Sequence, residues 1–127
     1  MKAHARILLA EDDRILRKAG EVTLGKKGYH VIVAVDGQDA WTKILEHPPD
    51  LILLDVMMPK LDGFEVLDRV KADPGTRGIP VIMLSNLDEA SNIRRAAECG
   101  AEAYLVKSSL RPGQLAEIVA KTLARGG

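Results

Sequence analysis

The sequence predicts an α/β protein in which helices cover both faces of a parallel β-sheet. Short apolar runs alternate with segments of helical periodicity, and this strand–helix unit recurs five times along the chain. Apolar runs without polar alternation are typical of strands that are buried on both faces. Alternating strands and helices favour a doubly wound parallel sheet, and right-handed crossovers leave few topologies open.

The predicted strands are short runs rich in aliphatic and β-branched residues. Each is bounded by acidic residues, glycine or proline, which mark the ends of strands. The runs are Arg6–Ala10, Tyr29–Val35, Asp50–Leu54, Pro80–Leu84 and Glu102–Val106. After the second run, the pair Asp36-Gly37 predicts a turn.

The predicted helices are marked by apolar residues that recur every three or four positions. The first spans Arg14–Lys27, with Asp13 suited to cap its start and Gly28 to end it. Gly100 closes the fourth helix, and Pro112 suits the first position of the last one. The apolar positions are Ile15, Leu16, Ala19 and Val22 in the first helix, Ala40, Trp41, Ile44 and Leu45 in the second, Phe64, Leu67 and Val70 in the third, Ala90, Ile93, Ala96 and Ala97 in the fourth, and Leu115, Ile118, Val119, Thr122 and Leu123 in the last.

Length and composition predict a single domain, residues 1–127, with a core at about 5–125. Basic and acidic residues both number 18, so no basic field is present to attract nucleic acid or a membrane surface. The single cysteine cannot form an internal disulfide, and no apolar run reaches the roughly 18 residues of a membrane span. The first residues lack the apolar segment of a signal peptide. We therefore expect a cytoplasmic protein that binds neither nucleic acid nor membranes directly.

Ionisable or hydroxyl side chains stand at the carboxyl ends of four predicted strands. They are Glu11 and Asp12 after the first, Asp55 after the third, Ser85 after the fourth and Lys107 after the fifth. Such strand ends meet in the crevice where open α/β sheets bind ligands. Three neighbouring carboxylates repel one another unless a cation lies among them, and oxygen ligands suit Mg²⁺. One magnesium ion and the Lys107 ammonium would balance the three negative charges.

Asp55 is the candidate nucleophile of this site. A metal-shielded aspartate can attack phosphorus and form an acyl phosphate. Phosphoryl transfer depends mainly on positioning and on neutralising the equatorial oxygens. Magnesium, Lys107 and the Ser85 hydroxyl would supply these from three sides.

Four segments carry a resemblance to a known family: residues 8–13 (Leu-Leu-Ala-Glu-Asp-Asp), 51–63 (Leu-Ile-Leu-Leu-Asp-Val-Met-Met-Pro-Lys-Leu-Asp-Gly), 83–85 (Met-Leu-Ser) and 101–107 (Ala-Glu-Ala-Tyr-Leu-Val-Lys). In this order and at these separations they are highly specific. The chain resembles the response-regulator receiver domain of two-component signalling, in the CheY-like superfamily, over nearly all of its length. The resemblance implies a flavodoxin-like (βα)5 sandwich with the sheet order 2-1-3-4-5.

The resemblance also implies how the site works. Asp55 would accept a phosphoryl group from a histidine kinase or a histidine phosphotransfer protein. Glu11, Asp12 and Asp55 would hold Mg²⁺ together with the backbone carbonyl of Met57. The domain would be a signalling phosphoacceptor that assists its own phosphorylation and dephosphorylation, and not an enzyme in the ordinary sense.

The implied output is a two-state switch. Ser85 and Lys107 would bind phosphoryl oxygens, and Tyr104 would turn inward when Ser85 is drawn toward the phosphate. The surface of the fourth helix, fifth strand and fifth helix would then change shape and be read by a downstream effector protein. The domain is expected to act as a monomer or a phosphorylation-dependent dimer.

The sequence departs from the family pattern near the phosphoryl pocket. Ser108 follows Lys107 where the family has a proline joined through a cis bond. A cis bond to a non-proline residue costs about 2.5–4 kcal/mol, so a trans bond and a reshaped loop are expected. Asn86 replaces a very small residue and would narrow access to the pocket. The water-gating positions, Met57 and Leu87, are apolar, which predicts a long-lived phosphoryl form.

Three alternatives remain open. A hydrolase of the haloacid dehalogenase type also uses an aspartate nucleophile, but it needs a second aspartate where this chain has Met57, and a cap domain for which 127 residues leave no room. A nucleotide-binding module would need G-x-x-x-x-G-K-[ST] or G-x-G-x-x-G, and neither occurs. A pseudo-receiver would keep the fold as a phosphorylation-independent scaffold. Ser108 and Asn86 favour this reading, and the complete set of site residues opposes it.

Overall fold

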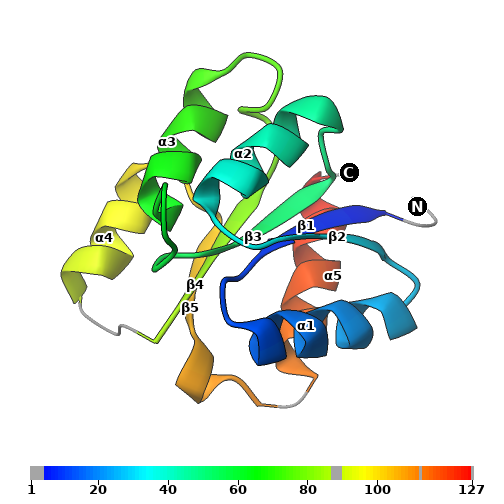
Figure 1. Ribbon diagram of the computed structural model, residues 1–127. Coiled ribbons are helices and arrows are strands. Elements are labelled where there is room, and N and C mark those ends of the chain that lie inside the picture. The colour runs from blue at the N-terminus through cyan, green and yellow to red at the C-terminus, as the bar shows by residue number, and fades with distance from the viewer. Residues whose placement is uncertain (1–4, 87–89, 112, 127) are drawn as a thin grey trace.

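The computed structural model describes residues 5–86, 90–111 and 113–126 and contains one parallel sheet (Figure 1). Its strand order is β2-β1-β3-β4-β5, as predicted. The strands are β1 (Arg6–Ala10), β2 (His30–Ala34), β3 (Leu51–Asp55), β4 (Val81–Ser85) and β5 (Ala103–Val106). The helices are α1 (Arg14–Lys26), α2 (Gly37–Glu46), α3 (Gly63–Ala72), α4 (Ala90–Glu98) and α5 (Gln114–Gly126), with a short 3₁₀ helix, η1, at Lys107–Ser109.

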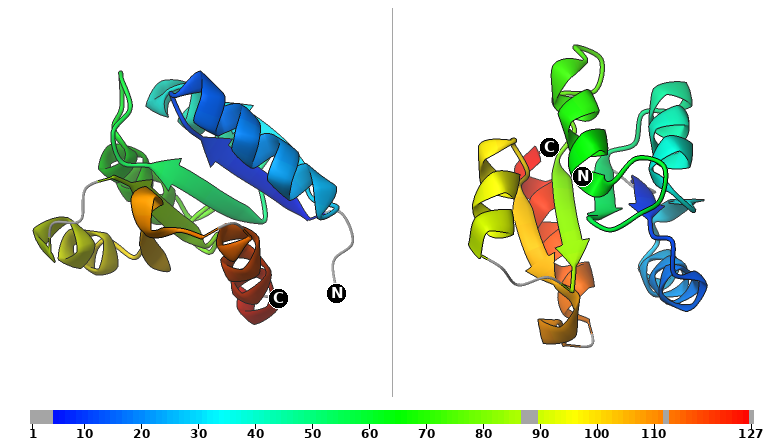
Figure 2. Two further views of the ribbon diagram at one scale, coloured as in Figure 1. Left: turned by 90° about the horizontal axis from the view of Figure 1, so that it is seen from below. Right: turned by 60° about the vertical axis from the view of Figure 1, so that its left-hand side comes forward.

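The helices form two layers around the sheet. Helices α2, α3 and α4 cover one face, and α1 and α5 cover the other (Figures 1 and 2). Each face has its own apolar core, because every residue of β3 and β4 is buried and successive side chains point to opposite faces. Leu8, Ile52 and Leu54 belong to the first core, and Leu51 and Leu53 to the second.

The strand register brings the carboxyl ends of the strands to one edge of the sheet. Ala10 pairs with Leu54 across β1 and β3, so the chain leaves β1 at the level where β3 ends in Asp55. Ser85, at the end of β4, pairs with Val106, and β5 therefore delivers the next residue to the same edge. Parallel pairing alone thus gathers the polar strand ends that the sequence singled out.

Local capping signals behave as predicted. The Asp13 carboxylate accepts hydrogen bonds from the backbone N–H groups of Ile15 and Leu16 at the start of α1. After α1, Gly28 has φ +94°, and after α4, Gly100 has φ +96°, a left-handed conformation that favours glycine.

The structure differs from the expectation for α1. The apolar residues that mark this helix are largely exposed, with Ile15 at 80% and Leu16 and Val22 above two fifths, and Leu24 is the residue that α1 buries. Gly20 approaches the side chain of Leu9 closely, so the helix rests on the sheet through a small residue. The periodicity identified the helix, but the face turned to the sheet is a different one.

Two further expectations need correction or fall outside the described residues. The pair Asp36-Gly37 does not form a free turn, because Asp36 caps α2 and Gly37 is its first residue. Pro112 lies outside the described residues, and α5 begins at Gln114, after Gly113 with φ +82°.

The Trp41 side chain is half-buried against the first core. None of the helices in the described part of the chain has the length and hydrophobicity of a transmembrane segment.

Candidate functional site

Three carboxylates meet at the carboxyl edge of the sheet. Glu11 and Asp12 follow β1, Asp55 ends β3, and one oxygen of each lies within 4.8 Å of the others. Glu11 and Asp55 are buried, at 3% and 5% exposure, and Asp12 is exposed. Two carboxylates of the cluster are thus buried beneath the surface, and the third is exposed to solvent.

Lys107 supplies the positive charge of this cluster. Its Nζ lies 2.5 Å from Oε1 of Glu11 and 3.1 Å from Oδ2 of Asp55. The ammonium therefore joins residues that follow or end β1, β3 and β5, strands that are far apart in the sequence. Charge-assisted hydrogen bonds of this kind are short and strong, particularly where solvent is excluded.

Backbone groups hold the remaining carboxylate oxygens. The N–H of Asp13 donates to Oε2 of Glu11 at 3.1 Å, and the N–H of Met57 donates to Oδ1 of Asp55 at 3.3 Å. Arg17, from α1, donates through Nη1 to the backbone carbonyl of Glu11 at 2.8 Å. The acidic turn after β1 is thus braced from the helix that follows it.

The electrostatics of the cluster are unequal. Burial, and then the neighbouring Glu11 carboxylate, raise the pKa of Asp55 to about 7, although Lys107 acts in the opposite direction. Burial also disfavours ionised Glu11, but its hydrogen bonds, first of all from Lys107, leave its pKa below the usual value. The pKa of Lys107 is raised, because its two carboxylate partners outweigh the effect of burial. Of the two buried carboxyl groups, Asp55 is therefore the one whose charge the site compensates less.

This donor set fits a hard divalent cation. Three carboxylate oxygens within reach of one another form the all-oxygen environment that Mg²⁺ prefers. Met57, whose backbone carbonyl was expected to contribute, lies two residues beyond Asp55 in the loop between β3 and α3, with its side chain 60% exposed. A cation at the cluster would offset the charge that now raises the pKa of Asp55.

Ser85 and Tyr104 lie on the neighbouring strands β4 and β5. Ser85 is buried at the end of β4, at the same edge of the sheet as Asp55. Tyr104 is half-buried in β5, opposite Met83, and packs against the first core, on the side of α2, α3 and α4. The roles of these two residues in phosphoryl binding and switching stay predictions.

The loop after β5 has the expected departure from the family pattern. The Lys107–Ser108 bond is trans, and the chain turns into η1, closed by a hydrogen bond from the N–H of Leu110 to the carbonyl of Lys107 at 3.2 Å. The Lys107 side chain nevertheless reaches both buried carboxylates. Asn86 is exposed, and Leu87 lies outside the described residues.

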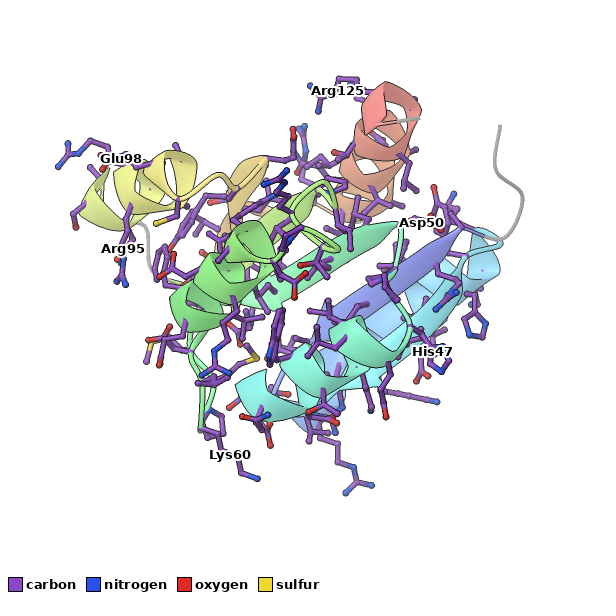
Figure 3. The ribbon with its side chains drawn as sticks, turned by 90° about the horizontal axis from the view of Figure 1, so that it is seen from above. His47, Asp50, Lys60, Arg95, Glu98 and Arg125 are labelled. Atoms are coloured by element: carbon purple, nitrogen blue, oxygen red, sulfur yellow. The ribbon has the colours of Figure 1, made fainter. Side chains whose placement is uncertain are left out.

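Some contacts around the site were not predicted. Arg17 bears no motif that marks it as a partner of the acidic turn. Lys60 has φ 71°, and its Nζ lies 3.6 Å from Oδ2 of Asp36, the residue that caps α2. Figure 3 shows Lys60 at the outer end of the β3–α3 loop, beside the first turn of α2. The positive φ of Lys60 is a property of the folded backbone, so the sequence alone could not have shown the Lys60–Asp36 contact.

Comparison with known proteins agrees with this geometry. The sequence profile of the response regulator receiver domain matches residues 7–120. The gliding motility regulatory protein of Myxococcus xanthus is 42% identical over 114 residues, which are 90% of this chain and 15% of that protein. Protein PilG of Pseudomonas aeruginosa is 35% identical over 102 residues, 80% of this chain and 76% of PilG. The chain thus spans a small part of the first relative and most of the second.

A solved receiver-domain structure has the same fold as this chain. The receiver domain of the Francisella response regulator 1452 superposes with a TM-score of 0.89 at 29% identity, over 97% of this chain and 99% of that one. The fold, the order of the sequence motifs and the profile match all indicate the same family. The chain belongs to the family of response regulator receiver domains of two-component systems.

Proposed function

We propose that the chain is a phosphoacceptor domain in which Asp55 receives a phosphoryl group from a histidine kinase or a histidine phosphotransfer protein. Residues 1–127 would form one domain with its core at about 5–125. The observation that supports this is the position of Asp55, a buried carboxylate that shares the Lys107 ammonium with Glu11 at the carboxyl edge of the sheet.

The transfer step follows from these groups. An oxygen of Asp55 forms a bond to phosphorus while the phosphorus–nitrogen bond of a phosphohistidine breaks. The electron pair of that bond stays on the imidazole, which takes up a proton. Lys107 neutralises charge on the transferred group, and the Ser85 hydroxyl donates a hydrogen bond to one of its oxygens.

A magnesium ion belongs to this proposal. Glu11, Asp12 and Asp55 would hold it through carboxylate oxygens, and Met57 through its backbone carbonyl. When bound, Mg²⁺ supplies positive charge that keeps the acceptor ionised and offsets the charge of the phosphoryl oxygens. The pKa of about 7 for Asp55 supports this need, because a protonated carboxyl group is a poor nucleophile.

Phosphorylation would then act as a switch. The added charge draws Ser85 toward the phosphoryl group, Tyr104 turns inward, and the α4–β5–α5 surface takes a second shape. A downstream effector protein would read that surface, in the cytoplasm, with the domain as a monomer or a phosphorylation-dependent dimer.

Acetyl phosphate tests the proposal. We expect the chain, incubated with acetyl phosphate and Mg²⁺, to gain the mass of one phosphoryl group. Asp55→Asn should abolish the gain, and Asp68→Asn, at an exposed position of α3, should leave it unchanged. A mass gain that survives in Asp55→Asn would refute the assignment of the acceptor. If the unmodified chain gains no mass, the phosphorylation-independent scaffold is the better reading.

A further inference from the structure

The loop between β3 and α3 runs against the first turn of α2, and the contact depends on a glycine. A Cβ atom at Gly37 would lie 1.7 Å from the carbonyl oxygen of Leu61 and 2.5 Å from its carbonyl carbon. These distances are far below van der Waals contact. The N–H of Gly37 also donates to the carbonyl of Pro59 at 3.4 Å. Helix and loop therefore touch backbone to backbone.

Two other contacts hold the same part of the loop. Lys60, with φ 71°, places its ammonium near the Asp36 carboxylate at 3.6 Å, and Asp36 is buried where it caps α2 through the N–H of Asp39 at 2.7 Å. The side chain of Met58 is buried in the first core. The ion pair is exposed on its lysine side and contributes little by itself. The position of the loop tip therefore depends mainly on the close approach of Leu61 to Gly37 and on the burial of Met58.

The base of the loop is held by a second glycine. A Cβ atom at Gly63 would lie 2.4 Å from the carbonyl oxygen of Asp55, and the N–H of Gly63 donates to the carbonyl of Val56 at 2.9 Å. Met57 lies between this fixed base and the tip held by α2. The path of the backbone at Met57 is thus determined from both sides.

We propose that Gly37 is a positioning residue for the divalent-cation site, acting through the loop that carries the Met57 carbonyl. This inference rests on the proposed function, because it takes that carbonyl as a ligand. A side chain at position 37 must push Leu61 away from α2, and the backbone at Met57 moves with it. The atoms nearest to a Cβ at Gly37 belong to Leu61 and not to the carboxylates of Glu11, Asp12 and Asp55. Cation affinity therefore falls through the loop, which carries both the Met57 carbonyl and the Met57 N–H that donates to Oδ1 of Asp55.

Magnesium titration of two alanine variants tests the proposal. Gly37→Ala is compared with Gly25→Ala, which also lies within a helix but whose Cβ would meet nothing within 4 Å. Calorimetric titration with MgCl₂ is carried out where circular dichroism shows every variant to be folded, so that Kd reports the folded protein. We expect Kd to rise at least tenfold in Gly37→Ala and to stay within twofold in Gly25→Ala. Equal affinity of Gly37→Ala and the unmodified chain would overturn the proposal.

A measurement on the unmodified chain covers the case in which Gly37→Ala does not fold. Coupling is reciprocal, so a loop contact that favours cation binding must itself be favoured by the cation. Mg²⁺ should therefore slow hydrogen exchange of the Gly37 amide, which is bonded to Pro59. The Gly28 amide, bonded to the carbonyl of Gly25 at the remote end of α1, serves as the control and should not change. Unchanged protection of Gly37 would overturn the inference.

The two experiments separate this inference from the proposed function. If the unmodified chain binds Mg²⁺ and is phosphorylated at Asp55, but Gly37→Ala binds Mg²⁺ normally, only the positioning role is lost. If the unmodified chain binds no Mg²⁺, the metal site of the proposed function fails, and the positioning role fails with it.

Discussion

Replacing Asp55 with asparagine is expected to stabilise the cation-free protein at pH 8. Asp55 is 5% exposed, and its pKa is raised from 3.8 to about 7 by burial first and by Glu11 second. A carboxyl group with a raised pKa binds its proton more tightly in the folded state than in the unfolded state. The stability it contributes is complete below about pH 4 and is lost as the pH rises through about 7.

The size of the effect follows from the same values. The interval from 3.8 to about 7 corresponds to roughly 4 kcal/mol, at about 1.4 kcal/mol for each unit of pH. Asparagine removes this penalty but also removes one partner of Lys107, so we expect a net gain of about 2 kcal/mol at pH 8. Asparagine is close to aspartate in size and leaves no cavity.

Glu11 and Lys107, the two ionisable partners of Asp55, titrate outside the pH range of the test. The pKa of Glu11 is lowered, so its contribution is lost only as the pH falls below 4.5. The pKa of Lys107 is raised above 10.5, so its contribution is lost only at higher pH still. Between pH 5 and pH 8 the difference in pH dependence between the unmodified chain and Asp55→Asn therefore reports Asp55.

Urea unfolding in EDTA at pH 5 and pH 8 measures the effect. The unmodified chain and the control Asp68→Asn should lose stability between the two values, and Asp55→Asn should lose much less. The m-value should be the same for all three, because the same surface is exposed on unfolding. Identical pH dependence in the unmodified chain and in Asp55→Asn would refute the electrostatic account of the site.

Three further outcomes follow from the structure. Lys107→Gln leaves two buried carboxylates without their counter-ion, so the free energy of unfolding at pH 8 should fall by about 3–5 kcal/mol in EDTA; an unchanged urea midpoint would contradict this. Ile15→Ser should change stability by less than about 0.5 kcal/mol, because the side chain is 80% exposed, whereas Leu24→Ala in the same helix should cost about 2–5 kcal/mol; similar thermal unfolding curves for the two variants would contradict the assigned helix face. Phosphorylated Asp55 should be long-lived, because the exposed Met57 side chain offers no group to orient an attacking water; a lifetime of seconds, followed by mass spectrometry, would rule this out.

Much of the fold follows from local physics that a single sequence displays. The helix starts at Asp13 and Asp62 depend on side chains that accept hydrogen bonds from N–H groups two or three residues away. The ends at Gly28 and Gly100 depend on a backbone conformation that glycine adopts without strain. Such signals act within one turn of the chain, and the observed elements begin and end close to the predicted positions.

The packing of α1 shows what local sequence patterns do not predict, namely which face of a helix is buried. A helix near the edge of the sheet needs only a narrow contact face, and here Leu24 and Gly20 provide it. The more conspicuous row of Ile15, Leu16 and Val22 has the right spacing for a helix but remains exposed. Spacing shows that a helix forms, and the neighbouring strands decide which way it faces.

The sequence predicts that five polar residues stand at strand ends, and parallel pairing brings such ends to one edge of the sheet. These residues are Glu11, Asp12, Asp55, Ser85 and Lys107. Two contacts depend on the packed chain and could not be predicted: the Lys107 ammonium bridges Glu11 and Asp55, and a glycine at the start of α2 admits the backbone of the β3–α3 loop. The physical reason is distance along the chain. Glu11 and Lys107 are 96 residues apart, and a contact of 2.5 Å between them exists only after every intervening element has packed.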